Sequence, residues 1–315
     1  MQRLNAFFKL NARTSTGCKC LCTAVLIVCL FDVVPGAQFS GGKTAVDGVL
    51  AYRHVEKLVS FGPRPPGSAG SQKAQDYIIS FLRRLHLTVA AQDFLANTPN
   101  GPIGMKNIVT SLPGEREQVI LLGSHYDTLP MRNGIFIGAN DGGSSTGLLL
   151  ELARVLSRKK PKYTLQFVFF DGEEAQIQWT ETDSLYGSRY FVDRVKQEDK
   201  LSSVKAMILL DMIGDKDLIL ENDLSSTSSL MELVRKSAQE LGYSKHLAKY
   251  PKGIVDDHIP FIQAGIPAVD LIDYDYGFNN IYWHTPNDTL DKVSPQSLKI
   301  VGEILLRTIE KLSND

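Results

Sequence analysis

Apolar runs that end in clusters of acids and histidines constrain the fold of this chain more than any other feature. Three of them are residues 119–122 before His125-Tyr126-Asp127, residues 165–170 before Asp171-Gly172-Glu173-Glu174, and residues 207–210 before Asp211. Short, continuous apolar runs are typical of strands that are buried on both faces. Ligand sites of open α/β sheets lie at the carboxyl ends of the strands. We therefore expect the clusters to share one site, and their acids and imidazoles indicate a hydrolase-like metal site.

The order of apolar and polar segments predicts a single α/β domain. Strands are expected near residues 87–91, 107–112, 119–124, 165–170, 206–211, 218–221 and 268–272, and helices near 144–157, 184–195, 226–241 and 295–312. Ser71 is the expected N-cap of a further helix, whose apolar stripe begins at Ala74. This alternation predicts a mixed, mainly parallel central sheet with helices on both faces. No linker-like segment divides it, so one catalytic domain is expected over residues 38–315.

The first 37 residues differ from the rest of the chain. Four basic residues come before an apolar stretch at residues 21–31, and the small residues Gly36-Ala37 follow it. This order predicts a secretory signal peptide at residues 1–37. A retained membrane anchor is the alternative, although the stretch is short for a span of about 20 residues. The expected location is therefore secreted or periplasmic, with no stable membrane association once the signal is removed.

Composition and charge exclude several kinds of partner. The chain has 315 residues, of which 43% are hydrophobic and 22% charged, as in a globular protein with one sizeable core. Removal of residues 1–37 would leave 30 Lys and Arg against 34 Asp and Glu, a net charge of −4. We therefore expect no nucleic-acid partner. All four cysteines lie in the predicted signal, so the mature chain would contain neither disulfides nor thiolate ligands.

Asp141, Glu174 and His284 have the side chains of a catalytic zinc site. Zinc binds nitrogen and oxygen donors tetrahedrally, and a catalytic site keeps one position open. Each residue also has an ordinary interpretation: Asp141 as part of a turn or helix N-cap, Glu174 as half of a solvated pair with Glu173, and His284 as a hydrogen-bonded loop residue. The shared position of the clusters at strand ends favours the metal site. Glu173 would then act as the general acid and base.

These clusters resemble the zinc aminopeptidase superfamily, which includes peptidase family M28, and within it the glutaminyl cyclases. The likeness to the superfamily rests on His125, Asp141, Glu173-Glu174, Asp211 and His284, and it runs from about residue 55 to 290. The narrower likeness rests on residues 61–68, 171–175 with Trp179, 183–189, 256–261 and 283–285. Glutaminyl cyclases close the N-terminal glutamine of peptides to pyroglutamate and release ammonia.

The resemblance implies a set of roles. One Zn²⁺ ion per chain would be bound by Asp141, Glu174 and His284. Glu173 would be the acid–base residue, and Asp211 would orient the substrate. The implied partners are peptides or proteins that begin with glutamine.

The resemblance also implies a substrate pocket with Trp179, Trp283 and Asp256, although either tryptophan could instead be an ordinary core or rim residue. Two residues depart from the family pattern. Ser124 stands where the animal enzymes have a disulfide-forming cysteine, and Asp270 stands where they have a histidine behind the site. Carboxylates would crowd around Asp270, and we expect at least one of them to keep its proton.

A metal-dependent aminopeptidase is the main alternative function. A second zinc would add His125 and Asp211 as ligands, with Asp141 bridging the two ions and Glu173 activating water. Those residues are present, but Gly142 stands where the aminopeptidases have a second aspartate. A non-catalytic binding module on the same scaffold is a further alternative, and it predicts the loss of a ligand or of the acid–base residue.

Overall fold

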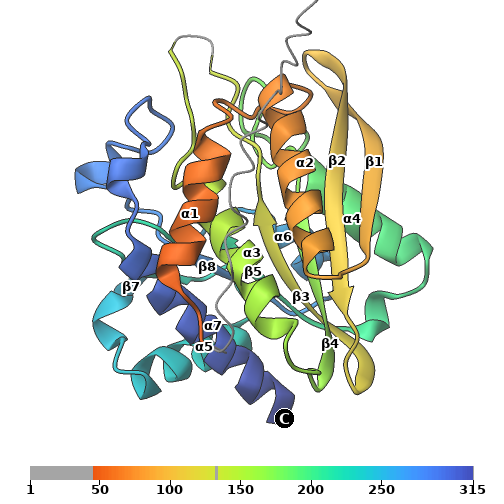
Figure 1. Cartoon of the computed structure of the whole chain (residues 1–315), viewed down its shortest axis with the longest axis vertical. Helices are drawn as coiled ribbons and strands as arrows, with labels where there is room; N and C mark the ends of the chain where they lie inside the picture. The colour runs from red at the N-terminus through yellow and green to blue at the C-terminus, as the bar shows by residue number, and fades with distance from the viewer. Residues whose placement is uncertain (1–44, 132–133, 315) are drawn as a thin grey trace, which may run out of the picture. The chain divides into compact units, whose positions relative to one another are not determined.

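The computed structural model describes residues 45–131 and 134–314. In it, the most apolar runs of the sequence form the parallel strands at the centre of a sheet (Figure 1). Within these residues the main sheet has the strand order β1-β2-β4-β3-β5-β8. Its parallel strands are β3 (Arg116–His125), β4 (Tyr163–Phe170), β5 (Val204–Asp211) and β8 (Ala268–Ile272). An antiparallel hairpin of β1 (Val89–Thr98) and β2 (Gly101–Leu112) is added at the β4 side. The predicted fold class is confirmed.

Helices cover both faces of the sheet because the side chains of its strands alternate between two cores. In β3, Ile120 and Leu122 belong to the larger core, whereas Leu121 belongs to the smaller one. The larger core is covered by α1 (Gly48–Val59), α2 (Ala69–Arg84), α3 (Gly143–Leu156), α5 (Ser228–Glu240) and α7 (Pro295–Asn314). The smaller core is covered by α4 (Tyr186–Gln197) and α6 (Ile259–Gln263). Strands buried on both faces explain the continuous apolar runs of the sequence.

Several elements differ from those expected from the sequence. The strand expected at residues 218–221 is β6 (Leu220–Asp223), and it pairs with β7 (Leu247–Lys252) in a separate small sheet. The strands expected at 87–91 and 107–112 are parts of the longer β1–β2 hairpin. The expected cap Ser71 is wrong: Ser68 is the N-cap of α2, and its Oγ accepts a hydrogen bond from the backbone N–H of Ser71 at 3.1 Å. Helices α1 and α6 and strand β7 were not expected.

The predicted signal peptide at residues 1–37 lies outside the described residues and stays a prediction. Among residues 45–131 and 134–314, no helix is long and apolar enough to cross a bilayer.

Arg64 joins its own loop to the connection between β3 and α3 at the carboxyl edge of the sheet. Its side chain is fully buried. The guanidinium donates hydrogen bonds to the carbonyl oxygens of Tyr126 (2.9 Å), Ile137 (2.7 Å) and Gly138 (2.8 Å). Its backbone N–H donates to Thr128 Oγ1 at 2.8 Å. Because the carbonyls of Tyr126 and Gly138 are buried and need a donor, the guanidinium fixes the connection that carries Asp141.

Replacing Arg64 should therefore destabilise the protein strongly. We expect Arg64→Met to lower the free energy of unfolding by at least about 3 kcal/mol, because two buried carbonyls and one half-buried carbonyl lose their donor. Arg53→Met is the control, since Arg53 is exposed on α1, and it should change stability by less than about 0.5 kcal/mol. Urea unfolding followed by fluorescence measures both, and equal midpoints for the two variants would contradict the role given to Arg64.

Candidate active site

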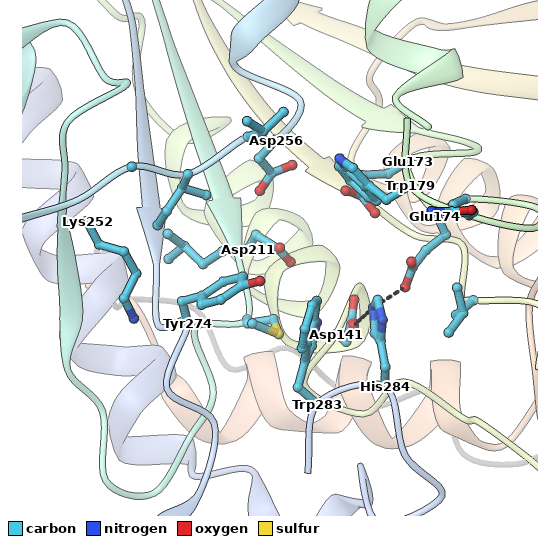
Figure 2. Close-up of a pocket in the computed structure, with 18 of the residues that line it drawn as sticks. Asp141, Glu173, Glu174, Trp179, Asp211, Lys252, Asp256, Tyr274, Trp283 and His284 are labelled. Carbon is cyan, nitrogen blue, oxygen red and sulfur yellow. Dashed lines mark ion pairs between the residues drawn. The ribbon is translucent and has the colours of Figure 1, made fainter. Parts of the chain in front are cut away.

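Asp141, Glu174 and His284 come together at the carboxyl edge of the sheet (Figure 2). Nε2 of His284 lies 3.3 Å from Asp141 Oδ2 and 3.2 Å from Glu174 Oε1. The ligand atoms of all three residues lie within 4.8 Å of one another. Donors that each bind zinc at about 2.0–2.2 Å stand at such separations.

The chemistry of this donor set fits a divalent cation. Asp141 Oδ2 and both carboxylate oxygens of Glu174 are buried without a hydrogen-bond partner. Unpaired buried carboxylate oxygens are costly unless a proton or a cation satisfies them. Burial disfavours the charged form of His284, yet Glu174 and Asp141 raise the pKa of its imidazole to about 10. The site therefore attracts positive charge.

A second group of possible ligands surrounds His125. Its Nε2 lies 3.2 Å from Asp141 Oδ1 and 3.1 Å from Asp211 Oδ1, and the latter contact is a hydrogen bond. The same three residues could also hold a metal ion by distance. Unlike the first group, however, this one has an internal hydrogen bond that joins an imidazole to a carboxylate. Asp141 belongs to both groups.

Two buried aspartates fix the backbone of the ligand loops. Asp127 accepts hydrogen bonds from the N–H groups of Glu173 (3.1 Å) and Glu174 (3.3 Å). Asp288 accepts from the N–H groups of Asn140 (2.8 Å) and Asp141 (3.1 Å). Supporting hydrogen bonds of this kind orient metal ligands. Sequence reasoning gave neither aspartate a role, because their partners are backbone groups far away in the chain.

The backbone at His284 is held in an uncommon conformation. Its φ of 52° lies in the left-handed region, which residues other than glycine rarely adopt. The imidazole stacks on the ring of Trp283 with 4.1 Å between centroids, and the ring of Phe136 meets it edge-on at 5.8 Å. A backbone with this φ is strained, and it persists only where neighbouring groups hold it in place, as often happens at functional sites.

The site opens into a cavity of about 740 Å³. Eight of the residues singled out from the sequence line it: Asp141, Glu173, Glu174, Trp179, Asp211, Asp256, Trp283 and His284. The remaining one, His125, is buried beside them. Trp179 is 38% exposed and so is not a core residue. Trp283 is partly buried and packs with Tyr274 against Met212, Ile254 and Ile272.

Behind the cavity lies a row of buried acids around His258. Burial raises the pKa of Asp270 well above its usual value, and the charges of Asp256 and Asp211 add to this effect. Burial and the charge of Asp211 likewise raise the pKa of Asp256. The expectation that at least one carboxyl here keeps its proton agrees with these shifts. The ring of His258 lies between Asp223 and Asp270, with Nε2 3.2 Å from Asp223 Oδ2 and Nδ1 4.0 Å from Asp270 Oδ2.

Comparison with known proteins agrees with this geometry. Residues 107–309 match the profile of peptidase family M28. The chain belongs to this family. A glutaminyl-peptide cyclotransferase of Bos taurus is 30% identical over 278 residues, which cover 77% of this chain and 76% of that protein.

Two solved structures are also similar to this chain. A glutaminyl cyclase from an Acidobacteriales bacterium is 37% identical with a TM-score of 0.83, covering 87% of this chain and 97% of that one. A Zn-dependent exopeptidase from Parabacteroides distasonis is 28% identical with a TM-score of 0.77, covering 86% of this chain and 99% of that one. The resemblance stated from the sequence, to the M28 family and its glutaminyl cyclases, is confirmed.

Gly142 stands at the position where the resemblance to the aminopeptidases implies a second aspartate. Its φ is +70°, in the region that favours glycine. A Cβ at this position would lie 2.6 Å from the carbonyl oxygen of Asp127 and 2.9 Å from Cε1 of His125. A side chain at residue 142 would therefore displace the imidazole of His125.

We expect Gly142→Ala to destabilise this M28 protein more than a glycine replacement in open space. Gly242→Ala is the matched control, because Gly242 has a φ of +77° and an added Cβ there would meet no atom within 4 Å. The control should lower the free energy of unfolding by about 1 kcal/mol, because alanine disfavours a positive φ. Gly142→Ala should lower it by about 2–4 kcal/mol, because steric overlap of the added Cβ comes on top of the unfavourable φ. Urea unfolding with a chelator present measures both, and equal losses would show that the space beside His125 is not needed.

Proposed function

We propose that this protein converts the N-terminal glutamine of peptides to pyroglutamate and releases ammonia. The proposal rests on one observation. The possible ligands Asp141, Glu174 and His284 line a cavity and have buried carboxylate oxygens without partners, and Glu173, which is not one of these ligands, lines the same cavity. Glutaminyl cyclases among the relatives support the same reaction. The substrates are peptides or proteins that begin with glutamine.

One zinc ion per chain is part of the proposal. Asp141, Glu174 and His284 would hold it, because their buried oxygens lack any other partner. When bound, zinc supplies a Lewis acid that polarises the side-chain carbonyl of the glutamine. A single ion is favoured because Asp211 is hydrogen-bonded to His125 in the second group.

Glu173 carries the proton in this mechanism. As the α-amine nitrogen bonds to the side-chain carbonyl carbon, the carboxylate of Glu173 accepts a proton from the amine. It then returns that proton to the amide nitrogen, whose bond to carbon breaks and which leaves as ammonia. Burial raises the pKa of Glu173 well above its usual value; His125 opposes the shift and Glu174 adds to it. A carboxylate with a raised pKa holds a transferred proton readily.

The remaining side chains orient the substrate. The attack is intramolecular, so the protein gains most by holding glutamine in a ring-closing pose. The carboxylates of Asp211 and Asp256 line the cavity and suit the α-amine. Trp283, stacked on His284, and Trp179, at the rim, suit the flat faces of the glutamine side chain and of the product ring.

Peptide hydrolysis by a two-zinc aminopeptidase is the second candidate function. It is supported by the complete second group around His125 and by the similarity to an exopeptidase. In that mechanism Glu173 would take a proton from water instead of from the amine. The two functions differ in their products and in the number of zinc ions.

Two substrates and a metal analysis separate the candidates. Purified protein is incubated with a peptide that begins with glutamine and with leucine anilide, and ammonia and aniline are measured. We expect ammonia from the first, no aniline from the second, and about one zinc per chain. Aniline without ammonia, together with two zinc ions, would replace cyclisation by peptide hydrolysis, and no turnover with no bound zinc would favour a binding module.

Replacement of Glu173 tests the proton carrier. Glu173→Gln should lower kcat for ammonia release by about 10²–10⁴-fold, because the amide cannot accept the amine proton. Bound zinc and the unfolding midpoint should stay unchanged, since Glu173 is not among the three zinc ligands proposed here. Glu117→Gln, at an exposed position at the start of β3, is the control and should keep full activity. Full activity of Glu173→Gln would refute the role assigned to this side chain.

A further inference from the structure

Lys252 is the only lysine or arginine among the described residues that line the active-site cavity. It is the last residue of β7, so it comes from the small sheet and not from the strands that carry the ligands. Figure 2 shows it beyond Tyr274, on the far side of that ring from Trp283 and His284. The cavity therefore has an acidic end, where glutamine would bind, and an end with one cation.

The ammonium group of Lys252 has one donor left over. It donates hydrogen bonds to Glu221 Oε1 at 2.6 Å and to Asp275 Oδ1 at 3.0 Å. It also lies over the ring of Tyr274, 5.1 Å from the centroid. An ammonium carries three N–H donors. Because two carboxylates already balance its charge, the third donor suits a neutral acceptor better than another carboxylate.

Glu221 and Asp275 fix Lys252 to different degrees. The side chain of Glu221 is 5% exposed, and that of Asp275 is 75% exposed. The buried pair with Glu221 holds the ammonium in place, whereas the pair with Asp275 is open to water and is worth little. The side chain of Lys252 is itself 35% exposed, so a ligand can reach it.

An apolar surface connects the two ends of the cavity. Met212, Ile254 and Ile272 form one cluster, and Trp283 and Tyr274 pack against it. Trp283 stacks on the proposed zinc ligand His284, and Tyr274 lies beneath Lys252. All five side chains line the cavity. An extended peptide that begins at the acidic end would thus lie on this cluster and reach Lys252 with its backbone.

We propose that Lys252 binds a backbone carbonyl of the residues that follow the glutamine, and so makes the enzyme selective for peptides over glutamine amide. The inference rests on the proposed function, and it names the part of the substrate recognised beyond the reacting residue. Lys252 contributes to binding and takes no part in the bond changes. The side chain after glutamine lies on the apolar cluster.

The test compares two neutral substrates, glutamine amide and the tripeptide amide Gln-Leu-Ala-NH2. In the wild-type protein the tripeptide amide should have the higher kcat/KM. Lys252→Met should lower its kcat/KM by about tenfold, mainly through KM, because a hydrogen bond from a charged donor is lost. The kcat/KM for glutamine amide should not change.

Two further variants separate recognition from support of the cavity. Lys249→Met changes an exposed lysine on the same strand that does not line the cavity, and both substrates should react as with wild type. Lys252→Met leaves the buried Glu221 without its cation. The double variant Lys252→Met/Glu221→Gln removes both charges. Like Lys252→Met, it should have a lower kcat/KM for the tripeptide amide and an unchanged kcat/KM for glutamine amide.

The outcomes distinguish the inference from the proposed function. Equal losses for both substrates would mean that Lys252 only supports the cavity, and no loss for either would mean that it does not touch the peptide; both overturn the inference. Calorimetry with the tripeptide amide compares binding without turnover when the zinc-loaded proteins carry Glu173→Gln, with and without Lys252→Met. Tighter binding in the presence of Lys252, together with no ammonia release by the wild-type protein, would uphold the inference and refute the proposed function.

Discussion

Asp141 stands between two imidazoles, and the arrangement of the whole site follows from it. One carboxylate oxygen lies 3.3 Å from His284 and the other 3.2 Å from His125. Burial opposes its charged form, but the two imidazoles lower the pKa of Asp141. The carboxyl group is held because Asp288 fixes the backbone on one side and α3 begins just after Gly142 on the other. Negative charge is favoured close to a helix N-terminus, so the fold itself supports this carboxylate.

The sheet explains why residues so far apart in sequence reach Asp141. β3 ends at His125, β5 ends at Asp211, and the glutamates follow β4. These strands are parallel neighbours, so their last residues meet at one edge. Helices on both faces exclude water from the sheet, and the acids therefore sit in surroundings where an unpaired charge is costly. That cost makes the site selective for a cation or a proton.

Features that depend on neighbouring residues in the chain could be predicted from the sequence, whereas features that depend on distant backbone groups could not. Ligands such as Glu174 follow directly after an apolar strand, so strand and ligand could be recognised together. Asp288 and Arg64 act on loops more than 60 residues away, and nothing near them in sequence marks those partners. Strand β7 was missed because none of its side chains is fully buried and it contains Pro251, so it lacks the apolar alternation of a strand. The helix cap was misplaced by three residues because Ser68 and Ser71 both fit the cap preference.

The small sheet of β6 and β7 shares no strand with the sheet that carries the ligands. The reaction chemistry and the proposed contact of Lys252 with the peptide backbone would therefore be encoded by separate segments of the chain. Substitutions in residues 247–255 can accumulate during divergence without disturbing the ligand positions at the ends of β3, β4 and β5. Under this proposal, changes in that segment would alter the peptide preference while the reaction stays the same, which gives an engineer a defined segment to randomise.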